Sequence, residues 1–193
     1  MSSGFTRHRK SGAALATFTA YEADTLRSLA GQLIELLRNE EAVPGAIDPL
    51  EAMLDFSGPT RAPEDPVLHR LFPTAYTEDA EAAAEFRRFT EADLRNSKAA
   101  AAASVIDALE DAGLGDLPED GTYIDVELDP ATALSWMRCL TDMRLAIATR
   151  LGIEDEQDVV RFSELADDDP AAFMYAAYEW LAFLQETLVG TVA

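Results

Sequence analysis

Aspartate is followed directly by proline at four places in this chain, and helix-forming residues follow each pair. The pairs are Asp48-Pro49, Asp65-Pro66, Asp129-Pro130 and Asp169-Pro170. An aspartate side chain accepts hydrogen bonds from the free N–H groups of a first helical turn, and proline fits the first helical position. The sequence therefore predicts four helix starts, which limits the chain to folds built mainly from helices.

Threonines mark further helix starts. Thr19 and Glu22 have the spacing of a capping box, which predicts a helix from about residue 20 to residue 39. Thr77 and Thr90 are also plausible caps, and we expect them to divide residues 78–112 into a shorter and a longer helix.

The segment Trp136–Ile153 reads as one amphipathic helix. Apolar residues recur at steps of three and four and so share one face: Trp136, Leu140, Met143, Ile147 and Leu151. The single cysteine, Cys139, lies on the same face. Gly152 then supplies a helix stop.

The last predicted helix, from about residue 170 to residue 189, has a broad apolar stripe. The stripe consists of Phe173, Ala177, Trp180, Leu184 and Leu188, widened by Tyr178, Leu181 and Phe183. A stripe this broad is either central in the core or shared with a second chain.

Strand signals are few. Residues 123–128 alternate between apolar and polar, and residues 4–9 and 13–18 could pair as a hairpin. The expected fold is therefore mainly α, with six to eight helices and a small antiparallel sheet of two or three strands.

We expect residues 1–193 to form a single domain. Residues 1–12 would be a mobile basic tail or an edge strand. Residues 40–66, rich in proline, would be a surface excursion whose large apolar side chains need burial: Leu50, Met53, Leu54 and Phe56.

The net charge of −21 narrows the range of partners. An acidic surface repels nucleic-acid phosphates and anionic lipid, and it attracts basic protein surfaces. The basic cluster at Arg7, Arg9 and Lys10 is too small to argue strongly for DNA binding. One cysteine and the lack of a stretch of about 20 apolar residues point to the cytoplasm and away from the membrane.

The sequence offers little reactive chemistry. His8 and His69 have no second histidine or cysteine at ligand spacing, so we expect no zinc site, no catalytic residue and no cofactor. His69 reads as a partly exposed helix residue.

Cys139 is the candidate redox-sensitive residue, and its alternative interpretation is a small core residue. Arg144, beside the apolar stripe, could be a buried guanidinium paired with Asp142 or Glu179. Its alternative is a packed stem with the charged head in water.

Three motifs carry a resemblance to a known family. They are Arg70-Leu71-Phe72-Pro73-Thr74-Ala75-Tyr76, the segment Trp136–Ile153, and Tyr178-Glu179-Trp180-Leu181 followed by Leu184-Gln185-Glu186. In order and spacing they resemble the actinobacterial AosR family, over a region from about Phe5 to Leu188. That family was long described only as a domain of unknown function.

The resemblance implies a non-enzymatic transcription regulator linked to oxidative stress. Family members are described as acting with an alternative sigma factor and raising expression of a cysteine-biosynthesis operon. Mycobacterial members are described as sensing oxidant through a disulfide in a Cys-x-x-x-Cys motif. This chain departs from that pattern, because Ser135 and Met143 occupy the positions four residues either side of Cys139.

The leading hypothesis is a cytoplasmic transcription regulator that contacts a sigma factor or RNA polymerase. Arg138, Arg144 and Trp180 are the candidate partner-binding residues. One alternative is a homodimeric interaction or scaffold protein of non-transcriptional function, which the broad C-terminal stripe suggests. Another is a helical domain that binds a small molecule, which would require a deep internal pocket.

Overall fold

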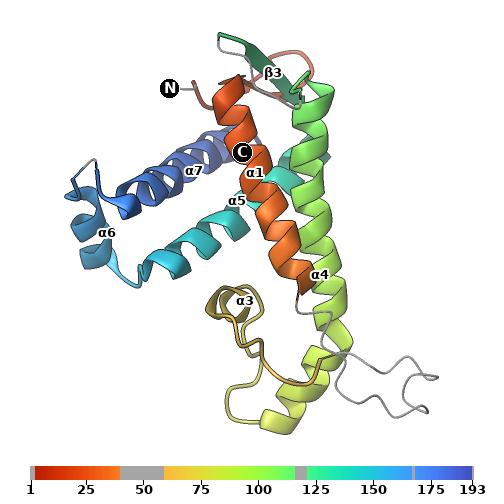
Figure 1. Cartoon of the computed structure of the whole chain (residues 1–193). Helices are drawn as coiled ribbons and strands as arrows, with labels where there is room; N and C mark the ends of the chain where they lie inside the picture. Colours follow the sequence, from red (N-terminus) through yellow and green to blue (C-terminus); the bar gives the residue numbers. More distant parts are fainter. Residues whose placement is uncertain (1–2, 40–58, 116–120, 167, 193) are drawn as a thin grey trace.

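The computed structural model describes residues 3–39, 59–115, 121–166 and 168–192 of the chain. In these residues it has six helices and one three-stranded antiparallel sheet, so the expected mainly α fold is confirmed. Figure 1 shows the sheet at one end of the long helices α1 (Ala20–Asn39) and α4 (Ala80–Asp111). The helices α5 (Pro130–Leu151) and α7 (Pro170–Val192) extend to one side, with α6 (Glu156–Ser163) at their far end.

Three of the four Asp-Pro pairs begin helices as predicted. The side chain of Asp65 accepts a hydrogen bond from Val67 N at 2.7 Å at the start of α3 (Pro66–Leu71). Asp129 accepts from the first turn of α5, and Asp169 accepts from the first turn of α7, at 2.8 Å each. Asp48-Pro49 lies outside the described residues, as do Leu50, Met53, Leu54 and Phe56.

The capping box at the start of α1 is also confirmed. Thr19 N donates to Glu22 Oε2 at 2.9 Å, and Glu22 N donates back to Thr19 Oγ1 at 3.2 Å. This reciprocal pair satisfies two N–H groups that a helix start leaves unpaired.

The predicted division of residues 78–112 is wrong, because α4 is one continuous helix. Its N-cap is Asp79, not Thr77, and Asp79 accepts hydrogen bonds from two first-turn N–H groups. Thr90 lies inside the helix, where its hydroxyl donates to Phe86 O at 2.8 Å. A threonine that bonds back to the preceding turn can stay within a helix.

The sheet has the order β1–β2–β3, with β1 at Thr6–Arg7, β2 at Ala14–Thr19 and β3 at Tyr123–Leu128. β2 pairs antiparallel with β3, from Ala14 opposite Leu128 to Thr19 opposite Tyr123. Alternate residues of β3 are buried, which places Ile124, Val126 and Leu128 on the core side and leaves the other face in water.

Within residues 1–12, Thr6 and Arg7 form the edge strand β1, and residues 1–2 lie outside the described residues. Phe5 is buried, and its N–H donates to Thr187 Oγ1 on α7 at 3.0 Å. Gly4 has a φ of +63°, and a Cβ there would lie 2.8 Å from Thr187 Cγ2. A side chain at position 4 would therefore push the strand away from α7.

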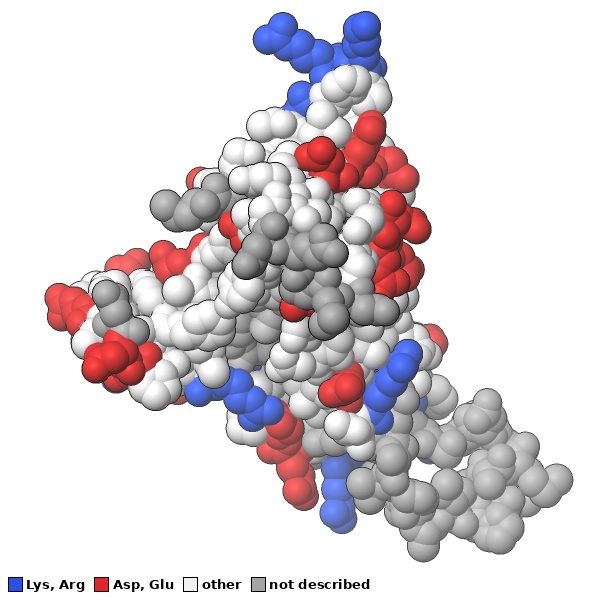
Figure 2. All heavy atoms as spheres, turned by 45° about the horizontal axis from the view of Figure 1, so that its top comes forward, with Lys and Arg blue, Asp and Glu red and all other residues white. Residues whose placement is uncertain are grey.

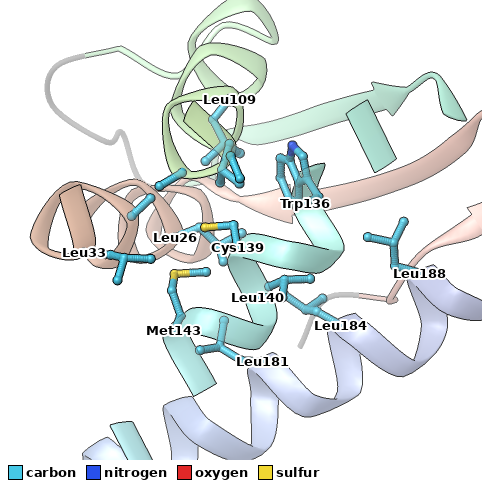
Figure 3. Close-up of a cluster of buried hydrophobic side chains, with 14 of the residues drawn as sticks. Leu26, Leu33, Leu109, Trp136, Cys139, Leu140, Met143, Leu181, Leu184 and Leu188 are labelled. Atoms are coloured by element: carbon cyan, nitrogen blue, oxygen red, sulfur yellow. The ribbon is translucent and has the colours of Figure 1, made fainter. Parts of the chain in front are cut away.

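The centre of the core is α5. Trp136, Cys139 and Leu140 on this helix are each 0% exposed. Figure 3 shows the α5 side chains among leucines from α1, α4 and α7. Trp136 also stacks on Phe18 of β2, with ring centroids 6.3 Å apart, and so joins the helices to the sheet.

The predicted stripe of α7 is correct only in part. Leu184 and Leu188 are buried, and Leu181 and Thr191 share their face. Phe173, in the first turn, is 65% exposed, and Phe183 is 42% exposed. At the start of α7 the neighbouring α6 covers Tyr175 instead, through a stacked contact with Phe162. A second chain that covers the exposed phenylalanines stays a prediction.

A buried group of charges binds α4 to its neighbours. Glu91 accepts from Arg87 Nη1 at 2.6 Å and from Arg95 Nη2 at 2.7 Å, and all three side chains are buried. The arginines also donate to Phe72 O and Leu37 O, at 3.2 and 2.8 Å. We call Arg87, Glu91 and Arg95 the buried triad; it fastens the end of α1 and the segment after α3 to α4.

Replacing Glu91 with alanine should destabilise the protein strongly. The substitution leaves two buried guanidinium groups without their carboxylate, which costs about 3–5 kcal/mol of unfolding free energy. Urea denaturation measures this loss, with Glu85→Ala on the exposed side of α4 as the control. A loss of less than about 1 kcal/mol for Glu91→Ala would contradict the role given to the triad.

Candidate functional site

The only cysteine is part of the core. Cys139 is 0% exposed, and Figure 3 shows its sulfur beside Leu26 of α1 and close to Met143 on α5. The pKa of the Cys139 thiol is raised to about 12, mainly by burial and also by the negative charge of the nearby Asp142 carboxylate. The core interpretation of Cys139 is therefore confirmed.

The burial of Cys139 limits its chemistry. The thiolate is the reactive form of cysteine, and reactive cysteines lie in exposed, electropositive settings. Cys139 has neither property in this conformation. Oxidation to a sulfenic acid or an intermolecular disulfide would require the core to open first. Redox sensitivity at Cys139 thus stays a prediction that depends on such opening.

Asp142 is a buried carboxylate that sequence reasoning weighed only as a partner of Arg144. Its side chain instead accepts from Lys98 Nζ on α4 at 2.7 Å. Burial raises the pKa of Asp142 above its ordinary value, although the Lys98 ammonium acts in the opposite direction. The pair therefore ties α5 to α4 at a cost in desolvation.

Arg144 adopts an arrangement that differs from both predicted alternatives. Arg144 is half-buried, and its Nη1 donates to the amide oxygen of Gln185 on α7 at 2.7 Å. It also lies over the ring of Tyr178, 5.2 Å from the centroid. Arg144 thus works at the interface of α5 and α7 as an internal contact.

The other two candidate partner-binding residues lie apart from this contact. Arg138 is exposed on α5, and Arg144 follows six positions later, which places the two about 120° apart around the helix. Trp180 is half-buried and packs against the core. The structure does not gather the three into one patch, and partner binding by each of them stays a prediction.

An acidic hollow lies where α4 meets β3 and the first turn of α5. It has a volume of about 430 Å³, and its polar lining consists of Asp107, Asp111, Asp125 and Glu127 with Ser104 and Thr132. We call this feature the acidic hollow. Sequence reasoning missed it, because its carboxylates come from two elements and share no local motif.

Figure 2 shows that acidic side chains gather in a band along one side of the molecule, below basic side chains at its tip. The four carboxylates of the hollow are exposed. The ion pairs found within the described residues do not include them. The hollow therefore presents negative charge that the described part of the chain does not neutralise.

The described residues contain no group of three or more histidine, cysteine, aspartate or glutamate side chains that could hold a metal ion. His69 is exposed on α3, in agreement with its interpretation as a helix surface residue. No described helix combines the length and the apolar character that crossing a membrane would need.

Native Cys139 should react slowly with a thiol reagent such as DTNB. Reaction should follow the rate at which the core opens, and it should become fast and complete in denaturant. A matched control places an exposed cysteine on the same helix, by Leu134→Cys in a Cys139→Ala background, because Leu134 is 50% exposed. Equal rates for the native thiol and this control would contradict the burial of Cys139.

The stability of the protein should respond to Asp142 in a defined direction with pH. Because the folded state raises the pKa of Asp142 above 3.8, ionisation costs folding free energy as the pH rises through and above that value. Asp142→Asn lacks this cost, so its stability relative to the wild type should increase from about pH 4 toward pH 7. Urea denaturation across this range is the measurement.

The exposed substitution Asp93→Asn controls for the loss of one negative charge. If the relative stability of Asp142→Asn fell as the pH rose, the ion pair with Lys98 would outweigh burial, and the prediction would be wrong.

Comparison with known proteins places the chain in a family. Residues 2–192 match the family described as a domain of unknown function, DUF2017. The chain is 32% identical over 183 residues to a protein of Mycobacterium leprae named putative oxidative stress regulator AosR. This match covers 88% of this chain and 77% of the relative. Proteins of Mycobacterium bovis and Mycobacterium tuberculosis named oxidative stress regulator AosR are 29% identical with the same coverage. No solved structure matches. The chain therefore belongs to the DUF2017 family and to the AosR family.

Proposed function

We propose that this protein is a non-enzymatic transcription regulator in the response to oxidative stress, and that it acts by contacting a sigma factor or RNA polymerase. The observation that carries the proposal is the identity of about 30% to regulators named AosR over 88% of the chain. The part of this chain that aligns with these regulators includes α5, the helix that forms the centre of the core.

The charge of the protein supports contact with another protein over direct contact with DNA. A net charge of −21 opposes binding to a phosphate backbone, whereas it favours encounter with a basic protein surface. The basic residues Arg7, Arg9 and Lys10 lie in and beside β1. They are too few to offset the repulsion from the rest of the chain.

The oxidant signal does not enter through an internal disulfide of this chain. Cys139 is the only cysteine, so no second thiol exists for it to pair with. Its burial and raised pKa further oppose direct oxidation. We therefore place the oxidant-sensing step in the partner or in the control of the amount of this protein.

Retention of RNA polymerase by the immobilised protein tests the proposal. Polymerase holoenzyme carrying an alternative sigma factor should be retained at about 0.15 M salt, while promoter DNA alone should not. Cys139→Ala should retain holoenzyme as well as the wild type does, because the thiol is buried away from any partner.

An unrelated helical protein of similar negative charge is the control for non-specific attraction. Tight DNA binding without polymerase, with a steep dependence on salt, would refute action through protein contacts. Equal retention of holoenzyme by the acidic control protein would refute a specific contact.

A further inference from the structure

The acidic hollow borders a strand edge as well as a group of carboxylates. Among the strands that the structure describes, β3 pairs with β2 alone, so β3 is an edge strand of the sheet. An edge strand presents main-chain N–H and C=O groups that can pair with an added strand. Asp125 and Glu127 of this strand line the hollow.

The charge around this edge selects the chemistry of the added strand. Asp107 and Asp111, one helical turn apart on α4, face the hollow together with the two acids of β3. Asp125 accepts a hydrogen bond from Thr17 Oγ1 at 2.7 Å, which holds its carboxylate over the sheet. A strand with basic side chains at alternate positions would direct them to one face, where these carboxylates can pair with them.

A second copy of this chain is a poor occupant of the hollow. Pairing of two β3 edges would bring two sets of four carboxylates together, and like charges across an interface oppose association. The basic residues Arg7, Arg9 and Lys10 lie in and beside β1, which is also an edge strand but is only two residues long, too short to pair along the six residues of β3. Charge complementarity therefore favours a different, basic protein.

We propose that the acidic hollow between α4 and β3 is the docking site for a basic, extended segment of a protein partner, which adds as a strand to the free edge of β3. This inference rests on the proposed function for the identity of that partner, a sigma factor or another polymerase subunit. Main-chain pairing would supply affinity, and the carboxylates would supply selectivity for lysine or arginine.

A peptide probe tests the docking site without the polymerase. The probe is a fluorescent peptide about ten residues long in which lysine alternates with threonine, so that its lysines share one face when it is extended. Binding by fluorescence anisotropy is compared between the wild type and a hollow variant with Asp107→Asn, Asp111→Asn, Asp125→Asn and Glu127→Gln. All four side chains are exposed, so the fold should tolerate the changes.

The control variant removes the same number of exposed carboxylates elsewhere, by Glu156→Gln, Glu164→Gln, Asp168→Asn and Glu186→Gln. The hollow variant should bind the peptide about tenfold more weakly than the wild type, and the control variant within about twofold. A peptide of equal charge with proline in place of threonine should also bind more weakly, because proline cannot complete a strand ladder.

Several results would overturn the proposal: equal weakening in both variants, no binding by the wild type, or equal binding of the proline peptide. Dimerisation that the hollow variant abolishes would also overturn it, because the hollow would then belong to a second copy.

The same variants are tested against polymerase holoenzyme. If holoenzyme binds the wild type and the hollow variant equally, the docking site is wrong and the proposed function stands. If the peptide results hold but holoenzyme does not bind, the proposed function is wrong and the docking site stands.

Discussion

The burial of one face of α5 is the constraint on which the rest of this structure depends. Trp136, Cys139 and Leu140 are sealed from water by α1, α4, α7 and the sheet. Because a core of this kind is close-packed, any event that exposes Cys139 must disturb several elements at once. The cysteine therefore serves packing first, and function has to be sought at the surface.

Charged residues have different roles in the core and at the surface. The buried triad and the Lys98–Asp142 pair use charge to join helices, and both place ionised groups where burial is costly. The carboxylates of the acidic hollow are exposed instead, and the described part of the chain leaves them without ion pairs. Charges of this second kind suit recognition of a partner, because pairing them removes repulsion and costs little desolvation.

Much of the fold could be predicted from local chemistry. Asp65, Asp129 and Asp169 cap helices that begin with proline, and the Thr19–Glu22 box begins α1, because such hydrogen bonds depend only on near neighbours. The helix break predicted at Thr90 was wrong, because near neighbours alone do not decide the role of a threonine. A threonine is compatible with a cap or with a helix interior, and only the buried contacts of Arg87, Glu91 and Arg95 decide between them. The four-residue spacing of Arg87, Glu91 and Arg95 was a sequence signal for a continuous helix.

The candidate site was harder to foresee, since its parts meet only in the folded chain. The acidic hollow is lined by residues of α4, β3 and α5, and Arg144 pairs with Gln185, which lies 41 positions later on α7. Hydrogen exchange of the free protein and of its complex with polymerase holoenzyme is the measurement that tests whether α5 stays buried while a partner binds at the acidic hollow. We expect the slowest exchange in α5 in both states, and new protection along residues 104–112 and 123–132 in the complex. Faster exchange in α5 on binding, with no new protection near the hollow, would mean that the protein acts by opening its core and would contradict this account.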